Sequence, residues 1–87
     1  MNELTVEAMD AKLTLKRPNH GLVFIQVGDG LIVQAAERQD IKLRHLPDDG
    51  EMPDAYIMRA GDTVYHLERY ALTRIGQFLE IHPDVVL

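Results

Sequence analysis

The chain contains no Cys, no Ser and no Trp among its 87 residues. Without Cys there is no disulfide framework, no thiolate nucleophile and no thiolate-ligated zinc site. Without Ser, covalent catalysis would have to use Thr, Lys, Tyr, His or a carboxylate. A chain of this length buries only roughly 60 to 65% of the surface that its unfolded state exposes. We therefore predict one domain over residues 1–87.

Long hydrophobic runs are also missing. The first residues include Glu3 and Glu7, where a secretory signal would carry basic residues. The longest weakly charged stretch, residues 21–36, is interrupted by Gly, Gln and Asp and is too short to span a membrane. We therefore expect a cytoplasmic protein without a membrane partner.

Positive charge is scarce, with nine Lys and Arg against 14 Asp and Glu and a net charge of −5. This balance argues against direct nucleic-acid binding, which requires clustered Lys and Arg. Residues 1–47 are neutral and residues 48–54 contribute −4, so one acidic loop at residues 47–54 carries most of the excess. Its Pro, Asp and Gly content predicts a solvated loop, and its spacing does not fit a calcium-binding EF-hand. The loop is a candidate acidic handle for a basic partner: Asp48, Asp49, Glu51 and Asp54.

Alternation of apolar and polar residues predicts strands. Residues 12–16 fit a strand with one face in water, followed by a turn at residues 17–21. Residues 22–27 and 31–36 flank Gly28-Asp29-Gly30, which predicts a β-hairpin. The glycines fit a turn rather than a phosphate-binding loop, because the third glycine and the following helix are absent.

The register of this hairpin decides which side chains face the core. Pairing Val27 with Leu31 makes one face entirely apolar, and a one-residue shift would exchange the two faces. On the opposite face, Phe24 and Ile32 are unusually apolar for a surface in water, so this face is either covered by the helix or used for association. The same register pairs Ile25 with Val33 and Val23 with Ala35.

Further elements follow along the chain. Residues 40–46 predict a strand, and Lys42 and Arg44 on one side of it suggest a protected sheet edge. Residues 56–58 and 64–67 predict a second hairpin, while the competing interpretation starts a helix at Thr63 with Asp62 as its N-cap. The first ten residues fit a strand or a helix.

One helix is indicated over residues 67–79 by apolar residues at helical spacing. Gly76 in its middle costs about 1 kcal/mol relative to Ala, which suggests that the backbone there lies close to the sheet or a partner. Pro83 is expected to end the helix, and residues 84–87 form an apolar tail that docks on the core, joins a sheet edge or is captured by a partner. The predicted class is α+β: a small antiparallel sheet of about four to five strands in hairpins, packed against one C-terminal helix.

The sequence carries no recognisable catalytic or metal motif. The four His residues are scattered, and we expect neither a metal nor a cofactor. His45, on the apolar side of its strand, is the best candidate for a response to pH. We expect a protein that is not an enzyme, although carboxylates distant in sequence can meet in space and act as acid and base.

The residue types that often dominate interfaces cluster late in the chain. The leading interpretation is a small protein-interaction or regulatory protein, such as an inhibitor, an adaptor or an antitoxin-like component. The alternatives are a dimeric chaperone or complex subunit, an acidic mimic of nucleic acid, and a small enzyme or ligand-binding domain. The same Tyr rings could instead cap the core while the Arg residues solubilise the helix. The predicted protein-binding residues are Tyr56, Arg59, Tyr65, Arg69, Tyr70, Arg74, Phe24 and Ile32.

Overall fold

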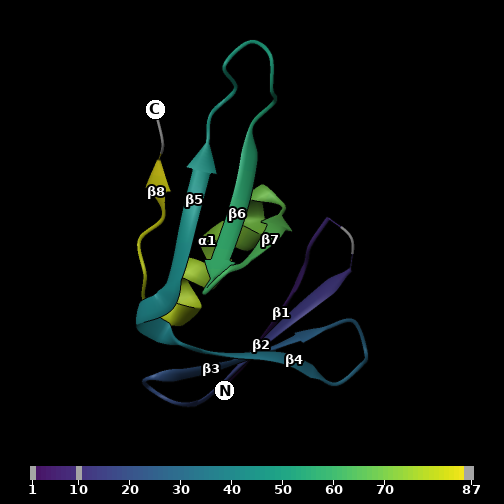
Figure 1. Ribbon diagram of the computed structural model, residues 1–87, viewed down its shortest axis with the longest axis vertical. Helices are drawn as coiled ribbons and strands as arrows, with labels where there is room; N and C mark the ends of the chain where they lie inside the picture. The colour runs from purple at the N-terminus through teal and green to yellow at the C-terminus, as the bar shows by residue number, and fades with distance from the viewer. Residues whose placement is uncertain (1, 10, 86–87) are drawn as a thin grey trace.

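A computed structural model of the chain describes residues 2–9 and 11–85 (Figure 1). The α+β class is confirmed, but the described residues form more strands than predicted, and these make two sheets. The elements are β1 (Glu3–Glu7), β2 (Lys12–Asn19), β3 (Leu22–Val27), β4 (Ile32–Glu37), the 3-10 helix η1 (Arg38–Asp40), β5 (Ile41–Leu46), β6 (Ala55–Ala60), β7 (Thr63–Leu67), α1 (Arg69–Leu79) and β8 (Asp84–Val85).

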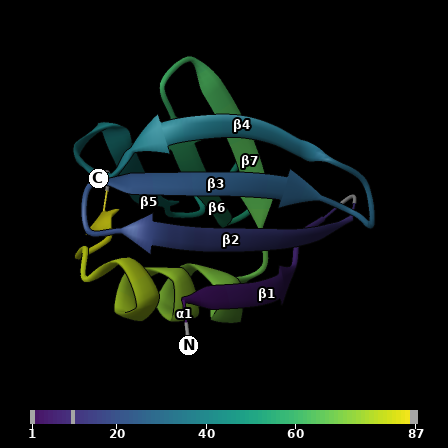
Figure 2. The ribbon, with the colours of Figure 1, turned by 90° about the horizontal axis from the view of Figure 1, so that it is seen from below.

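The two sheets lie crosswise, with α1 in the corner between them (Figures 1 and 2). The first sheet has the order β1-β2-β3-β4, and the second has the order β7-β6-β5-β8. Neighbouring strands are antiparallel except β5 and β8, which are parallel. An isolated bridge between Ala8 and Leu67 joins the end of β1 to β7. The chain passes from one sheet to the other through η1, a change of direction that residue alternation does not predict.

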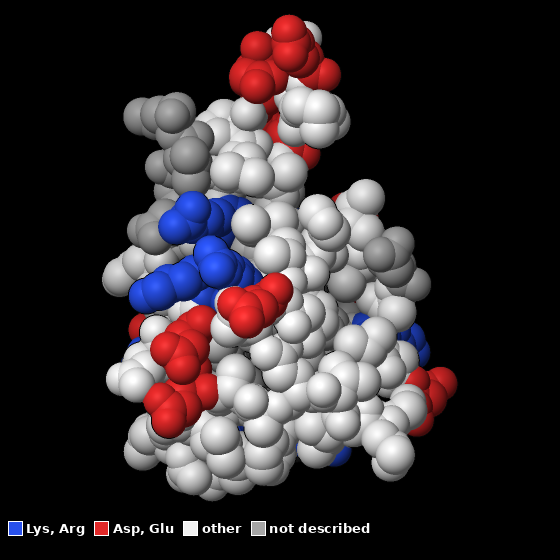
Figure 3. Space-filling view, in the orientation of Figure 1, with Lys and Arg blue, Asp and Glu red and all other residues white. Residues whose placement is uncertain are grey.

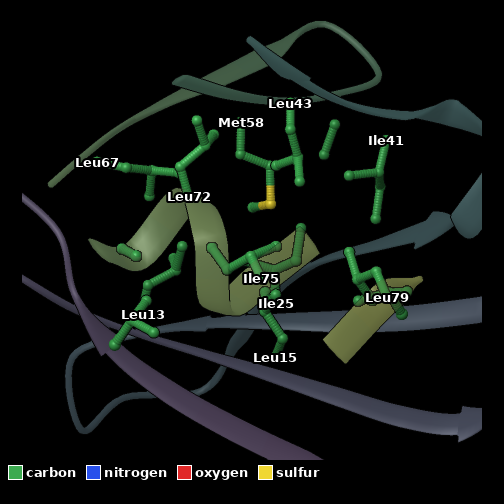
Figure 4. Close-up of a cluster of buried hydrophobic side chains, with 14 of the residues drawn as sticks. Leu13, Leu15, Ile25, Ile41, Leu43, Met58, Leu67, Leu72, Ile75 and Leu79 are labelled. Carbon is green, nitrogen blue, oxygen red and sulfur yellow. The ribbon is translucent and has the colours of Figure 1, made fainter. Parts of the chain in front are cut away.

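The core fills the corner between the three layers (Figure 4). Leu15 and Ile25 come from the first sheet, Leu43 and Met58 from the second, and Ile75 from α1; all five are 0 or 1% exposed. Full burial of one such side chain contributes roughly 1.5 to 3 kcal/mol. The hydrophobic contacts between layers therefore hold the two sheets at their crossing.

The structure decides between the alternatives left open by the sequence. The first residues form the strand β1, and the second hairpin is formed by β6 and β7. The interpretation with Asp62 as a helix N-cap is therefore wrong, because Thr63 begins a strand and α1 begins only at Arg69, after the N-cap Glu68.

The helix reaches the last of the predicted apolar residues and ends well before Pro83. It stops at Leu79, and Glu80 adopts a left-handed conformation with φ of 59°, so Pro83 is not what ends it. The last carbonyl oxygens are held by two Arg side chains that sequence reasoning missed. Arg17 Nη1 donates to Phe78 O at 2.8 Å, and Arg38 Nε donates to Leu79 O at 2.6 Å. Cations at this end also interact favourably with the helix dipole.

The close approach predicted at Gly76 is confirmed. A Cβ atom there would lie 2.9 Å from Ile81 O and 3.5 Å from Leu43 Cδ1. The chain after α1 thus folds back against the helix, and Asp84–Val85 then joins β5 as β8. The sheet-edge alternative for the tail holds for these two residues, while Val86 and Leu87 lie outside the described residues.

The predicted register of the first hairpin is wrong. Ile25 pairs with Gln34 and not with Val33, because a β-bulge leaves Val33 as an extra residue. Val23 lies opposite Ala36 instead of Ala35 for the same reason. The predicted core pair Val27 and Leu31 is exposed, by 37% and 88%.

Two other predictions need correction. The strand before the first turn continues to Asn19, because residues 17–19 extend β2 where a turn was expected. The strand β5 is not an edge, since β6 lies on one side of it and β8 on the other. Lys42 and Arg44 therefore lie on the solvent face of the second sheet rather than protecting an edge.

Candidate functional site

The predicted Tyr and Arg residues do not form one continuous surface. Tyr56 and Tyr65 are half-buried on the core-facing side of the second sheet, whereas Arg59 is exposed on its opposite side. The remaining three lie exposed on α1 or at its start: Arg69, Tyr70 and Arg74.

Two of the Tyr hydroxyls are engaged within the molecule. Tyr65 donates to Gln34 Oε1 at 2.7 Å, and burial raises the pKa of Tyr65. Tyr70 Oη accepts a hydrogen bond from the main-chain N–H of Glu7 at 2.7 Å. These hydrogen bonds join the two sheets and attach β1 to α1.

His45 lies near the acidic loop. Its ring stacks on Tyr56, with centroids 4.6 Å apart, and its Nε2 lies 3.3 Å from Asp54 Oδ1. The same oxygen accepts the N–H of Asp48 at 2.8 Å. The N–H of Asp48, and then the His45 ring, lower the pKa of Asp54. The His–Asp pair thus ties the loop to the end of β5.

The acidic loop projects from the tip of the β5–β6 hairpin, as the red cluster in Figure 3 shows. Some of its carboxylates accept hydrogen bonds within the loop. Asp49 Oδ1 accepts hydrogen bonds from the main-chain N–H groups of Glu51 and Met52, both at 2.9 Å. These bonds lower the pKa of Asp49. In the described part of the chain, no three His, Asp or Glu side chains come together as metal ligands.

Basic residues gather on the outer face of the second sheet, below this loop in the view of Figure 3. Lys42 and Arg59 are cross-strand neighbours, and Arg44 lies two residues further along β5. All three are exposed. In the sequence, each of these residues occupies a position that alternates with the buried residues of its strand. The pairing of β5 with β6, which brings them together, cannot be predicted from that alternation.

The edge strand β4 is the most unusual surface of the molecule. No described strand pairs with its outer side. Leu31, Ile32 and Val33 are 88%, 45% and 60% exposed, and no charged residue occurs from Leu31 to Ala36. Natural proteins usually protect such an edge with charge, Pro or a covering element, because an open strand pairs readily with another chain. The described residues of β4 carry a different protective feature, the β-bulge at Val33, which locally disturbs the edge.

Two other strands have described contacts on the side away from their first neighbour. The free side of β1 receives Tyr70 on its Glu7 N–H, and Met9 N donates to His66 O at 3.2 Å where β1 meets β7. The outer side of β5 carries β8. Figure 2 shows β1 beside α1 and β4 at the opposite margin of the first sheet. In the described part of the chain, β4 combines an unpaired edge of six residues with exposed apolar side chains.

Phe24 and Ile32 occupy the outer face of the first sheet beside this edge. Phe24 is half-buried opposite Ala35, and Ile32 lies opposite Gln26. The helix packs on the other face of this sheet, against core residues such as Leu15 (Figure 4). The alternative in which the helix covers Phe24 and Ile32 is therefore wrong.

An apolar hollow of about 220 Å³ lies between the β1–β2 turn and β7. A cavity of about 150 Å³ can hold benzene, so the volume admits one large apolar side chain. His66 is part of the lining, but no described Asp or Glu accompanies it there. The His–carboxylate pair that would favour an enzyme or a ligand-binding domain is thus not formed by the described lining: Ala8, Ala11, Lys12, Leu13, Val27, Val64, Tyr65 and His66.

Comparisons with known proteins give no relative. No family model matches the chain, and no curated protein or solved structure matches it either. Among the described residues, no helix is long and apolar enough to cross a membrane, and α1 has 11 residues.

Proposed function

We propose that this chain is a small protein-interaction protein that binds an extended polypeptide segment by strand addition along β4. The observation that carries this proposal is the open edge of β4 with the exposed side chains of Leu31, Ile32 and Val33. In strand addition, main-chain hydrogen bonds supply affinity, and alternate side chains of the added strand supply specificity.

The character of the edge supports a protein partner. A nucleic acid would require clustered cations, whereas residues 31–36 carry no charge. Gln34 supports the strand from the inner side: its Nε2 donates to Ala60 O at 2.7 Å, and its Oε1 accepts from Tyr65. Because β4 is already fixed in an extended conformation, binding does not have to order it. Such a module would act as an inhibitor, an adaptor or an antitoxin-like component rather than as an enzyme.

Selection from a random-peptide display library tests this proposal. The wild-type chain is the bait, and Val33→Lys and Ile32→Lys place a charge on the edge. Val64→Lys is a matched control, because Val64 lies on a different strand and is 45% exposed, as Ile32 is. Circular dichroism and urea denaturation establish that each variant is folded.

The proposal expects apolar extended peptides that bind the wild-type chain and the Val64 variant but lose at least tenfold in affinity for the edge variants. Peptides that lose affinity only for Val64→Lys would place binding in the apolar hollow, which Val64 lines, and overturn the proposal. The absence of any peptide that prefers the wild-type chain to the edge variants would overturn it as well.

A further inference from the structure

We infer that β4 pairs with β4 of a second copy of this chain, antiparallel about a twofold axis, so that two four-stranded sheets become one continuous sheet. This inference rests on the proposed function, because both use the same open edge. A second copy of the chain occupies this edge when no other partner is bound.

Charge favours a second copy as the occupant. Self-pairing brings a strand against its own sequence, so a charged residue near the twofold axis would meet a like charge. Residues 31–36 carry no charge, and the first charged residue is Glu37 at the end of β4. In a pairing centred on Ala35, the two Glu37 residues lie on opposite sides of the axis, four residue positions apart. This corresponds to roughly 13 Å at about 3.3 Å per residue, beyond the screening length of about 10 Å in 0.1 M salt.

Side-chain size favours the antiparallel direction. The first half of β4 carries the large residues Ile32 and Val33, and the second half carries the small residues Ala35 and Ala36. Antiparallel pairing centred on Ala35 sets methyl against methyl at the axis, places Gln34 beside Ala36 of the second copy, and sets Val33 beside the Glu37 side chain of the second copy and not beside another Val33. A parallel pairing would instead align large residues with large ones and Glu37 with Glu37.

The remaining edges explain why assembly would stop at two copies. A twofold interface uses the same surface on both chains, so it closes both open β4 edges at once. The outer margins of the joined sheet would then be the two β1 strands. Each is already covered by its own Tyr70 and by the bridge between Ala8 and Leu67. Within the described residues, the joined sheet therefore has no second margin like β4, where an unpaired strand carries exposed apolar side chains.

Sedimentation equilibrium from low micromolar to millimolar concentration tests this inference. The wild-type chain should change reversibly from monomer to dimer, with no larger species. Val33→Glu should weaken the dimer at least tenfold, because the new carboxylate would lie opposite Glu37 of the second copy, where like charges repel. The matched control Val64→Glu should dimerise as the wild-type chain does. Amide hydrogen exchange of the wild-type chain is the second measurement and needs no variant to fold: protection within residues 32–37 should increase with protein concentration.

A wild-type chain that stays monomeric throughout this range would overturn the inference. A dimer that persists in Val33→Glu, without added protection at residues 32–37, would place self-association on another surface and overturn it as well. Neither result affects the peptide selection, which judges the proposed function separately. Where both hold, a selected peptide should dissociate the dimer, because the two occupants compete for one edge.

Discussion

Replacement of Gly76 by Ala sets two effects against each other. Gly76 lies in the middle of α1, where Ala would stabilise an unhindered helix by about 1 kcal/mol. The structure leaves no space for the methyl group, because a Cβ atom would lie 2.9 Å from Ile81 O. That oxygen belongs to the main chain, and the N–H of Ile81 donates to Gly76 O at 2.9 Å. The obstacle therefore cannot move away as a flexible side chain would.

The unfavourable effect is the larger one. Overpacking in a fixed environment costs about 1 to 3 kcal/mol, and a weakened hydrogen bond from Ile81 adds up to about 1 kcal/mol. After subtraction of the helix-propensity gain, the net cost lies between about 0 and 3 kcal/mol. From the middle of this range, Gly76→Ala should lower the free energy of unfolding by about 1 to 2 kcal/mol. With a urea dependence of about 1 kcal/mol per molar for a small domain, the unfolding midpoint falls by about 1 to 2 M.

Urea denaturation followed by circular dichroism measures this change, with Gly21→Ala as the matched control. Gly21 does not have a positive φ, and the nearest atom to its Cβ position is 3.7 Å away. The control should keep the wild-type midpoint or raise it slightly, because Ala restricts the unfolded chain. A Gly76→Ala midpoint equal to or above that of the wild type would refute the close approach of residue 81 to the helix.

Three further predictions use the same denaturation assay. Arg38→Ala should lower the free energy of unfolding by about 2 kcal/mol, because it removes the hydrogen bonds that a charged group donates to carbonyl oxygens at the end of α1. The control Arg74→Ala, at an exposed position of α1, should change it by less than about 0.5 kcal/mol. Equal effects of the two substitutions would contradict the capping role of Arg38. Tyr65→Phe should cost about 1 kcal/mol, since it leaves Gln34 Oε1 without its donor, and no measurable loss would show that this bond is unimportant. Because the pKa of Asp54 is lowered in the folded protein, its carboxylate stabilises the fold above the unfolded pKa of about 3.9, and this contribution is lost as pH falls through the folded pKa. The difference in free energy of unfolding between the wild type and Asp54→Asn should therefore disappear below about pH 4. A difference that stays constant with pH would count against the loop contacts of Asp54.

The elements that the sequence predicts correctly are those whose pattern is local. In α1, Ala71, Ile75 and Leu79 recur every four residues and are all 0% exposed. In β2, Leu13 and Leu15 alternate with polar neighbours and are at most 1% exposed. Burial on one face imposes these periods directly, so helix and strands can be read from neighbouring residues alone.

The features that the sequence does not reveal depend on contacts between distant residues. Arg17 reaches the end of α1 from 61 positions away, and Arg38 does so from 41. Tyr70 covers the β1 edge from 63 positions away. No local pattern separates these side chains from ordinary surface Arg and Tyr. The division into two sheets has the same origin, because it depends on where the chain turns at η1.

The wrong register at β4 has a different cause, which bears on function. Alternation places Val33 inside and Gln34 outside, yet the bulge exposes Val33 by 60% and turns Gln34 inward. The amide is satisfied there by Ala60 O and the Tyr65 hydroxyl, so the reversal leaves no unpaired polar group to destabilise the fold. It does place an apolar side chain in water at an open edge, which brings the isolated chain no burial. Departures from the local pattern of this kind concentrate at functional sites. A strand bound along β4 would bury the Val33 side chain and so supply the hydrophobic stabilisation that the isolated chain lacks there.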